Sequence, residues 1–267
     1  MPRRDLLLVW GIIYNKDTKK YVCWLKIMNR DGSQTETVLT ADHILGPYTK
    51  VREGLKPLNM SAGDFDLAVA PDGKAYYYFE RVHSEIICAD LTADYTDVTG
   101  YYSTHFPHIS PPYVREATAH FMRRGKHYLV TSGTTGYLPN PSEVAMADTW
   151  HGPYAVLGNP HPGDESRTSF HSQISSVFQV EGKKDLYIAV ADCWVPDHME
   201  LRYEEYAAEF ERIFDPDYDG EIKFDEKFGM DGERDTSIAD YVWLPFRFEG
   251  DRPYLDWTDE WRIEDFD

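Results

Sequence analysis

The chain has 267 residues, with 46 acidic against 27 basic side chains, and its formal net charge is −19. This excess of negative charge opposes binding to nucleic acid or to an anionic membrane surface, whereas a neutral ligand such as a sugar is compatible with it. Aromatic residues make up 15% of the chain and suit sugar faces, although β-sheets are rich in them in any case.

The first apolar run, from Leu6 to Trp10, follows two arginines. It is too short for the apolar segment of a secretory signal and lacks a cleavage site, so we expect a β-strand. The sequence as given shows no export signal and no apolar run long enough to span a membrane. Cys23, Cys88 and Cys193 are odd in number and far apart, which predicts buried thiols and no disulfide framework.

A short unit recurs along the chain: a polar turn, a basic residue, a tyrosine and an apolar strand. The tyrosines that mark its five copies are Tyr21, Tyr76, Tyr128, Tyr187 and Tyr254, at intervals of 55, 52, 59 and 67 residues. Further strand-like runs, at 85–89 and 144–147, lie between them. Several short strands in each such period are typical of an all-β fold, the β-propeller, with one blade per repeat. A β-sandwich with accidental hairpin similarity is the alternative.

One segment interrupts the pattern and accounts for the longest interval. Residues 201–214 have helical spacing, with apolar side chains on one side at Tyr203, Tyr206, Ala207, Phe210, Ile213 and Phe214. We therefore expect a single propeller domain over residues 1–267 that carries a helix-loop insertion at 198–235.

The insertion also contains an acidic loop. Residues 215–226 match the calcium loop of an EF-hand at Asp215, Asp217, Asp219, Gly220, Ile222 and Glu226. Carboxylate ligands from Asp215, Asp217, Asp219, Glu221 and Glu226 suit a structural Ca²⁺. EF-hands usually occur in pairs, and Gly229 falls where the exiting helix would be, so a solvated acidic loop is the alternative.

Two carboxylates stand in the same relation to two copies of the turn. Asp64 lies nine residues before Gly73, and Glu116 lies nine residues before Gly125. We expect both to point toward one place, where one acid protonates a glycosidic oxygen and nearby charge sets its pKa. Asp66, two residues from Asp64, is a rival on the same strand face, and a salt bridge to Arg115 is the rival role for Glu116.

The chain resembles glycoside hydrolase family 43, in particular its exo-β-1,3-galactanases and related galactosidases. The resemblance rests on the order and spacing of several pieces: residues 12–24, 63–76, 115–133, 137–140, 169–173, 192–194 and 241–245. It implies a five-bladed propeller with an axial pocket and hydrolysis with inversion. Four full blades plus a closing fragment is the alternative form expected for this chain. The resemblance implies that the chemistry requires no cofactor, and it does not indicate an oligomeric state.

Site residues are carried over by position. Glu116 matches the family's general acid, Asp64 the carboxylate that tunes its pKa, and Gln173 a glutamine that positions the attacking water. Tyr137, Asn140 and Trp194 are expected to line the pocket. His171 is expected near the axis, beside a water or a metal. Ordinary packing or backbone hydrogen bonding is the alternative for Gln173, His171 and Trp194.

Two departures from the family bear on catalysis. Family members have a further blade before the position of Ile12, which supplies an aspartate base, and only eleven residues precede that point. Leu8 stands where the galactanases have a glutamate.

We therefore expect a glycosidase that acts on β-linked galactosyl or similar side chains of plant-type polysaccharides, with export expected from the resemblance. A non-hydrolytic carbohydrate-binding propeller and a calcium-dependent interaction module around residues 201–230 are the alternatives.

Overall fold

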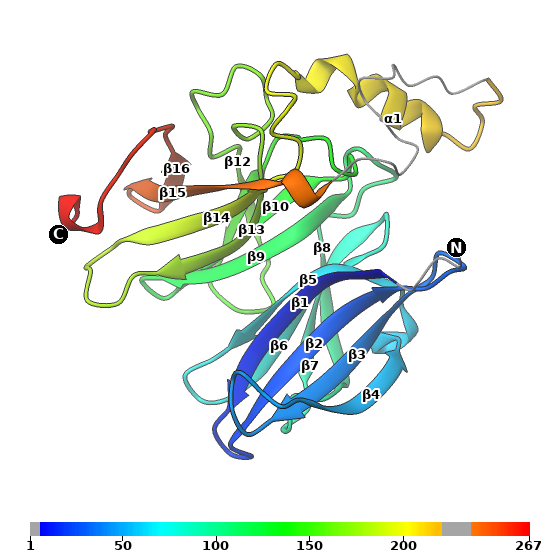
Figure 1. Ribbon diagram of the computed structural model, residues 1–267, viewed down its shortest axis with the longest axis vertical. Helices are drawn as coiled ribbons and strands as arrows, with labels where there is room; N and C mark the ends of the chain where they lie inside the picture. Colours follow the sequence, from blue (N-terminus) through cyan, green and yellow to red (C-terminus); the bar gives the residue numbers. More distant parts are fainter. Residues whose placement is uncertain (1–5, 221–235) are drawn as a thin grey trace.

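The computed structural model describes residues 6–220 and 236–267, without the side chains of residues 6–10. The described residues form four antiparallel sheets of four strands each, in sequence order (Figure 1). Blade 1 consists of β1 (Leu6–Asn15), β2 (Lys20–Met28), β3 (Gln34–Ala41) and β4 (Thr49–Leu55). Blade 2 consists of β5 (Ala62–Val69), β6 (Ala75–Arg81), β7 (Glu85–Leu91) and β8 (Val98–His105).

The second half of the chain repeats this arrangement. Blade 3 consists of β9 (Arg115–Arg123), β10 (Lys126–Gly133), β11 (Glu143–Ala147) and β12 (Ala155–Gly158). Blade 4 consists of β13 (Gln173–Gln179), β14 (Tyr187–Cys193), β15 (Asp240–Glu249) and β16 (Arg252–Leu255). Short 3-10 turns occur at Pro57–Asn59 (η1), Thr236–Ile238 (η4) and Ile263–Asp265 (η5).

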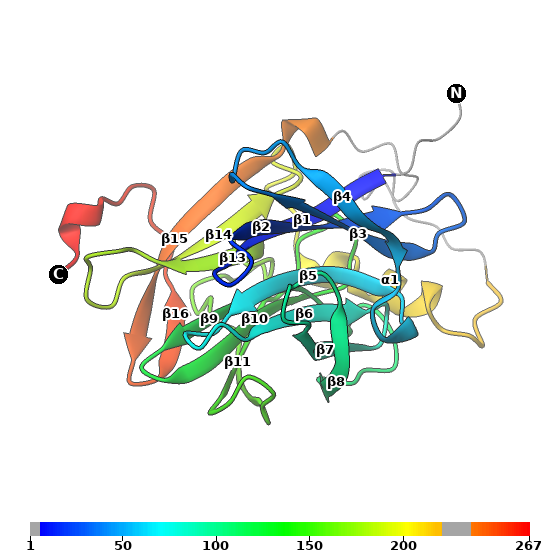
Figure 2. The same ribbon diagram turned by 90° about the horizontal axis from the view of Figure 1, so that it is seen from below.

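The first strand of each blade lies innermost, and these strands pack side by side in the order β1, β5, β9, β13 (Figures 1 and 2). Apolar side chains fill the space between neighbouring blades. Trp24 and Tyr77 pack between blades 1 and 2, Tyr78 and Leu129 between blades 2 and 3, and Phe121 is in the cluster between blades 3 and 4. Sheets that bury both faces in this way are the blades of a β-propeller, so the predicted fold is confirmed.

The tyrosine markers locate the blades, with one exception. Tyr21, Tyr76, Tyr128 and Tyr187 each lie on the second strand of a blade. Tyr254 lies instead on β16, the outermost strand of blade 4. The interpretation of Tyr254 as the marker of another blade is therefore wrong, because a polar turn followed by a basic residue and a tyrosine also suits the last hairpin within a blade.

The predicted insertion is partly helical. A 3-10 turn, η2 (Tyr203–Glu205), leads into α1 (Ala207–Ile213), which is shorter than the pattern suggested. Its apolar side packs onto the body of the propeller, where Leu201, Tyr206 and Phe210 are buried against Leu138. The helix lies at one end of the molecule (Figure 1).

The three cysteines are buried free thiols, as the sequence predicted. Of the helices in the described ranges, none is long and apolar enough to cross a membrane.

Candidate active site

All four inner strands carry a β-bulge near their first residues. The pairing of β1 with β2 shifts at Leu8, that of β5 with β6 at residues 63–64, that of β9 with β10 at 117–118 and that of β13 with β14 at Ser175. Bulges bend a strand and redirect side chains, and they are common beside active sites. Asp64 lies in one bulge, Glu116 directly before another and Gln173 two residues before a third.

Asp64 is held by a cross-blade ion pair. Lys26 Nζ, from β2, lies 2.7 Å from Asp64 Oδ1, and the lysine side chain is 7% exposed. Gly63 makes room beside it for a second carboxylate, because a Cβ at Gly63 would stand 2.0 Å from Glu80 Oε2. The backbone bulge and this glycine together bring Asp64 and Glu80 into one acidic cluster.

Asp66 does not compete with Asp64 for the site. Its Oδ2 accepts the backbone N–H of His120 at 2.7 Å, and its Oδ1 accepts that of Leu67 at 2.8 Å. Burial raises the pKa of Asp66 to about 6 despite these hydrogen bonds. Backbone donors thus engage both carboxylate oxygens of Asp66, and the side chain joins β5 to β9.

Glu116 occupies a partly buried, electronegative position. Burial first, and then the charges of Asp64 and Glu80, hold the pKa of Glu116 well above its usual value, against the opposing charge of Lys26. The charge of Asp64 is the second cause of this shift, after burial, and the convergence of the two acids on one sugar site stays a prediction. Arg115 forms no competing salt bridge, because its guanidinium donates to Thr131 Oγ1 at 3.0 Å and to Thr131 O at 2.7 Å.

Gln173 links the acid to the neighbouring blade. Its Nε2 donates to Ser132 Oγ at 2.8 Å and makes a long contact of 3.4 Å with Glu116 Oε1. Its Oε1 accepts the indole N–H of Trp194 at 3.2 Å. The amide is therefore fixed in orientation, and one lone pair of Oε1 is left for a further donor.

Four of the predicted site residues line one small hollow. Tyr137, His171, Gln173 and Trp194 surround a cavity of about 10 Å³ together with Asp192. That volume is close to the minimum for a single water molecule. The ring centroids of Tyr137 and Trp194 lie 5.5 Å apart, and Tyr137 is 40% exposed, so an aromatic surface borders the hollow.

A strained loop leads into this hollow. Ser169, Phe170 and His171 have φ values of 56°, 57° and 58°, three consecutive non-glycine residues in the left-handed region. Asp164 holds the loop, since its carboxylate accepts the backbone N–H groups of Thr168 and Phe170. Backbone strain of this kind clusters at functional sites, where the surrounding structure maintains it.

Asn140 is engaged within the protein. Its Oδ1 accepts the backbone N–H of Gly133 at 2.6 Å, and its Nδ2 donates to Gly133 O at 2.8 Å and Thr135 Oγ1 at 2.7 Å. The side chain is 3% exposed. Its amide stabilises the loop that carries Tyr137 through these hydrogen bonds. Asn140 does not line the hollow with the other predicted site residues.

Three buried charged residues of the site escaped the sequence analysis: Lys26, Glu36 and Glu80. Glu36, on β3, is fully buried and accepts a hydrogen bond from Tyr77 Oη at 3.0 Å. Burial raises the pKa of Glu36 to about 8 and that of Glu80 to about 7. The only signal in the sequence is at Lys26, a charge between the apolar residues Leu25 and Ile27, and that pattern also fits the exposed side of a strand. Glu36 lies between two threonines and Glu80 beside Arg81, so neither differs locally from a solvated charge.

The predicted calcium loop falls partly outside the described residues. Asp215, Asp217 and Asp219 are exposed, and Asp215 Oδ1 accepts the backbone N–H of Asp217 at 2.9 Å. Glu221 and Glu226 lie outside the described residues. Within residues 6–220 and 236–267, no cluster of three or more His, Cys, Asp or Glu side chains is placed to hold a metal ion. Calcium binding stays a prediction.

The structure is thus a β-propeller that carries Asp64 on the inner strand of blade 2 and Glu116 on the inner strand of blade 3. The chain belongs to glycosyl hydrolases family 43, whose family model matches residues 10–191. No curated protein shows a significant match to the sequence.

Solved structures of this family are similar over most of the chain. A family 43 β-1,3-galactosidase is 26% identical, with a TM-score of 0.76. A second β-1,3-galactosidase, solved with galactodeoxynojirimycin, is 23% identical with a TM-score of 0.74. An exo-β-1,3-galactanase variant from Phanerochaete chrysosporium, solved with β-1,3-galactotriose, is 20% identical with a TM-score of 0.69.

Coverage differs between the two sides of these comparisons. The three matches cover 98%, 97% and 94% of this chain, but only 47%, 77% and 48% of the respective relatives. The chain therefore spans about half the length of the first galactosidase and of the galactanase.

Proposed function

We propose that this protein hydrolyses a terminal β-linked galactosyl unit, or a closely similar sugar, with inversion at the anomeric carbon. The observation that carries the proposal is the environment of Glu116, a partly buried carboxyl whose pKa is raised by desolvation and by the charges of Asp64 and Glu80. The choice of sugar rests on the solved relatives, described as β-1,3-galactosidases and as an exo-β-1,3-galactanase.

Glu116 is the proton donor. With its raised pKa it keeps its proton near neutral pH and delivers it to the glycosidic oxygen as the bond to the leaving group breaks. Asp64 stays beside it and disfavours its ionisation, since two neighbouring negative charges repel. Lys26 fixes Asp64 through the 2.7 Å ion pair and so sets the direction of that charge.

Gln173 orients the attacking water. The remaining lone pair of its Oε1 is available to a water in the hollow next to Tyr137 and Trp194. A neutral amide does not take a proton as a carboxylate base does, so this arrangement positions the nucleophile and leaves the proton to pass to solvent. The exposed ring of Tyr137 provides a face on which a sugar can stack.

The neutral amide of Gln173 also favours a second candidate function, that of a carbohydrate-binding propeller without hydrolysis. Its support is the neutral amide at Gln173 in the place of an aspartate base. The two candidates differ in one measurable outcome, because the binding protein retains sugar and releases none.

Glu116→Gln tests the proposal. We expect a loss of β-galactosidase activity on β-1,3-galactan of roughly 10²-fold to 10⁴-fold, because the amide has no proton to donate. An aryl β-galactoside, whose leaving group needs less protonation, is expected to lose less. Glu85→Gln, the same change in an exposed ion pair with Arg81 on blade 2, serves as the control. Wild-type turnover of galactan by Glu116→Gln would reject the assignment.

A further inference from the structure

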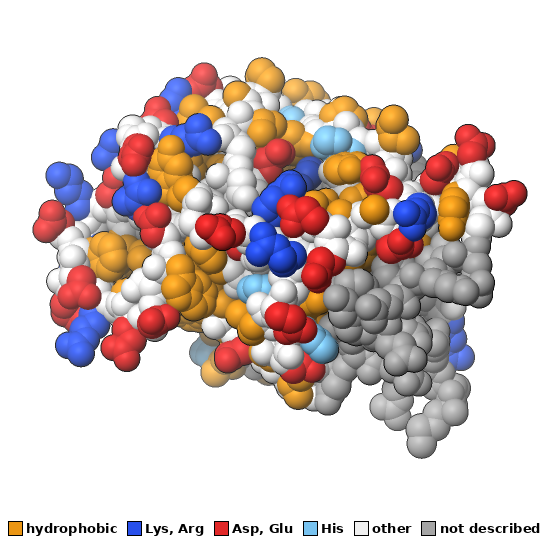
Figure 3. All heavy atoms as spheres, turned by 90° about the horizontal axis from the view of Figure 1, so that it is seen from above, with side chains coloured by type: hydrophobic (Ala, Val, Ile, Leu, Met, Phe, Trp, Pro, Cys, Tyr) orange, Lys and Arg blue, Asp and Glu red, His pale blue; other side chains and the backbone are white. Residues whose placement is uncertain are grey.

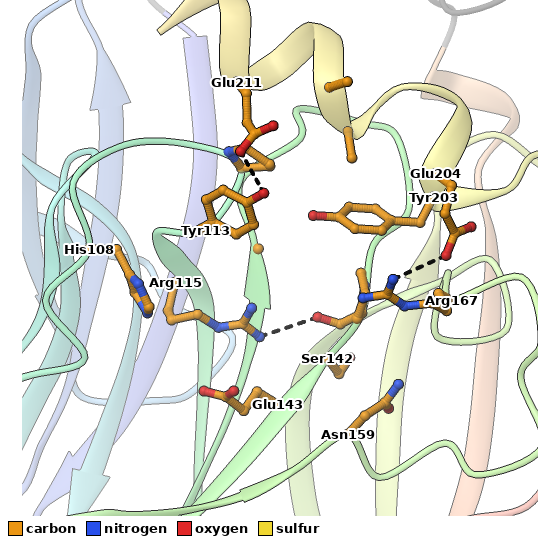
Figure 4. A pocket seen from close by; sticks show the side chains of 15 residues that line it. His108, Tyr113, Arg115, Ser142, Glu143, Asn159, Arg167, Tyr203, Glu204 and Glu211 are labelled. Atoms are coloured by element: carbon orange, nitrogen blue, oxygen red, sulfur yellow. Dashed lines mark hydrogen bonds and ion pairs between the residues drawn. The ribbon is translucent and has the colours of Figure 1, made fainter. Parts of the chain in front are cut away.

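A second and larger cavity is lined by neither member of the acid pair. It encloses about 610 Å³ between η2 and α1 on one side and blade 3 with its loops on the other (Figure 4). Ligand pockets commonly have volumes of about 300 to 1,000 Å³. Neither Asp64, Glu116 nor Gln173 lines it, so it is a separate site.

A buried arginine forms one wall. Arg115 is 8% exposed, and its guanidinium is held by Thr131 and, at 3.3 Å, by Pro141 O. Figure 4 shows this guanidinium directed toward the middle of the cavity, with Glu143 beside it. A donor that is fixed in place before a ligand arrives loses little side-chain entropy on binding.

Two tyrosines supply aromatic surface, Tyr113 on the side of Arg115 and Tyr203 across the cavity from it (Figure 4). Tyr203 is 8% exposed, and its hydroxyl points into the cavity in Figure 4. Arg167 lies over the Tyr203 ring at 5.2 Å and pairs with Glu204 at 3.1 Å. Tyr113 donates its hydroxyl hydrogen bond to Glu211 at 2.7 Å, which holds its ring at the entrance.

The charges around the cavity nearly balance. Arg115 and Arg167 face the carboxylates of Glu143, Glu204 and Glu211. The end of the molecule that carries α1 shows the same mixture, with acidic and basic side chains interspersed (Figure 3). An anionic ligand would meet the three carboxylates, and a cationic ligand would meet the two guanidinium groups, so the balance favours a neutral ligand.

We propose that this cavity is a second saccharide site, which binds a neutral glycosyl unit. Fixed donors and acceptors at Arg115, Tyr203 and Glu143 match the alternating hydroxyl groups of a sugar, and the tyrosine rings cover its apolar face. The proposal goes beyond the hydrolytic function, because binding in this cavity does not depend on the acid at Glu116.

The test counts sugar sites with β-1,3-galactobiose as the probe. The protein carries Glu116→Gln to prevent turnover, and binding is measured by calorimetry and by protein-observed NMR. We expect two sites per chain. Ala208→Trp, which places a large ring at an exposed lining position of α1, should remove one site with at least a tenfold loss of its affinity. Ala208→Ser, the matched small substitution, should leave both.

The outcomes separate this proposal from the hydrolytic one. A single site that Ala208→Trp does not affect would overturn the second site and leave the axial site standing. A single site lost in Ala208→Trp would support the cavity and count against sugar binding at the axis.

Glucuronate provides the check of ligand class: binding of glucuronate, and not galactobiose, at the site sensitive to Ala208→Trp would overturn the assignment of a neutral ligand. A melting temperature unchanged by Ala208→Trp shows that the fold is intact.

Discussion

Glu116 owes its proposed role to its neighbours more than to its own chemistry. An ordinary glutamic acid is ionised at neutral pH and has no proton to give. Burial disfavours its charge, and Asp64 and Glu80 disfavour it further, while Lys26 partly offsets them. Among these partners, the charge of Asp64 has the largest effect on the pKa of Glu116, and that effect is the role proposed for Asp64.

Removal of that charge gives a directional prediction. In Asp64→Asn, Glu116 loses a negative neighbour, ionises more easily and has a lower pKa. The acid form then disappears at lower pH, so the alkaline limb of the profile of kcat/KM against pH should move down by about one unit. Glu85→Gln on the same blade, which removes a carboxylate outside the site, should leave the limb in place. An unshifted limb in Asp64→Asn would show that Asp64 does not tune the acid.

At the scale of elements, the bulges and one loop determine where the site residues point. The loop from Asp164 to His171 carries four strained residues, Arg167 and Ser169 to His171, each at a cost of about 1 kcal/mol or more. Asp164 offsets this cost by accepting the N–H groups of Thr168 and Phe170, and that of Ser166 at 3.1 Å. Without this acceptor the strained turn would lose the hydrogen bonds that stabilise it, and Gln173 lies two residues after its end.

Asp164→Ala should therefore impair catalysis by misplacing Gln173 and its water. We expect kcat/KM to fall at least about tenfold, because small displacements of positioning groups are costly. Asp94→Ala is the matched control: Asp94 makes the same kind of turn, to Thr92 and Thr96, in a loop of blade 2. Kinetics and thermal melts of both variants test the idea. Equal losses of stability with full activity in Asp164→Ala would contradict it.

At the scale of the whole molecule, the sequence predicted what local patterns specify. Turn chemistry and alternation placed four second strands correctly at Tyr21, Tyr76, Tyr128 and Tyr187, and failed at Tyr254 because an outer hairpin has the same local pattern. Equal spacing from two turns placed Asp64 and Glu116 at equivalent points of blades 2 and 3. Gln173 entered by family resemblance alone.

The remaining features depend on contacts between distant segments. Lys26 meets Asp64 across 38 residues, and Tyr77 meets Glu36 across 41. A charge in a strand gives no sign of whether it faces solvent or a partner from another blade. The second cavity combines Tyr113, Arg167 and Glu204 from three separate segments, which no local pattern brings together.

The buried carboxyls make the stability of the whole fold depend on pH. Burial raises the pKa of Glu36 from 4.5 to about 8, so between these values the folded protein holds a proton that the unfolded chain has released. Folding is therefore favoured at low pH, and stability falls as pH rises through this window, by about 1.4 kcal/mol per pH unit for one proton. Glu80 acts in the same direction up to about pH 7. Buried histidines act in the opposite direction at lower pH, since burial lowers the pKa of His120 to about 3 and that of His105 to about 4.

Glu36→Gln should remove one proton from the difference in bound protons between the folded and the unfolded chain. Its amide keeps an oxygen for the Tyr77 hydroxyl and does not ionise, so the free energy of unfolding should decline less steeply than in the wild type between pH 5 and pH 8. The difference in slope should approach about 1.4 kcal/mol per pH unit. Urea unfolding at a series of pH values measures it, with Glu85→Gln as the control for loss of a carboxylate. Parallel curves of unfolding free energy against pH for Glu36→Gln and the wild type would mean that Glu36 is ionised in the folded protein. Lys26 would then have two carboxylates to neutralise, those of Glu36 and Asp64.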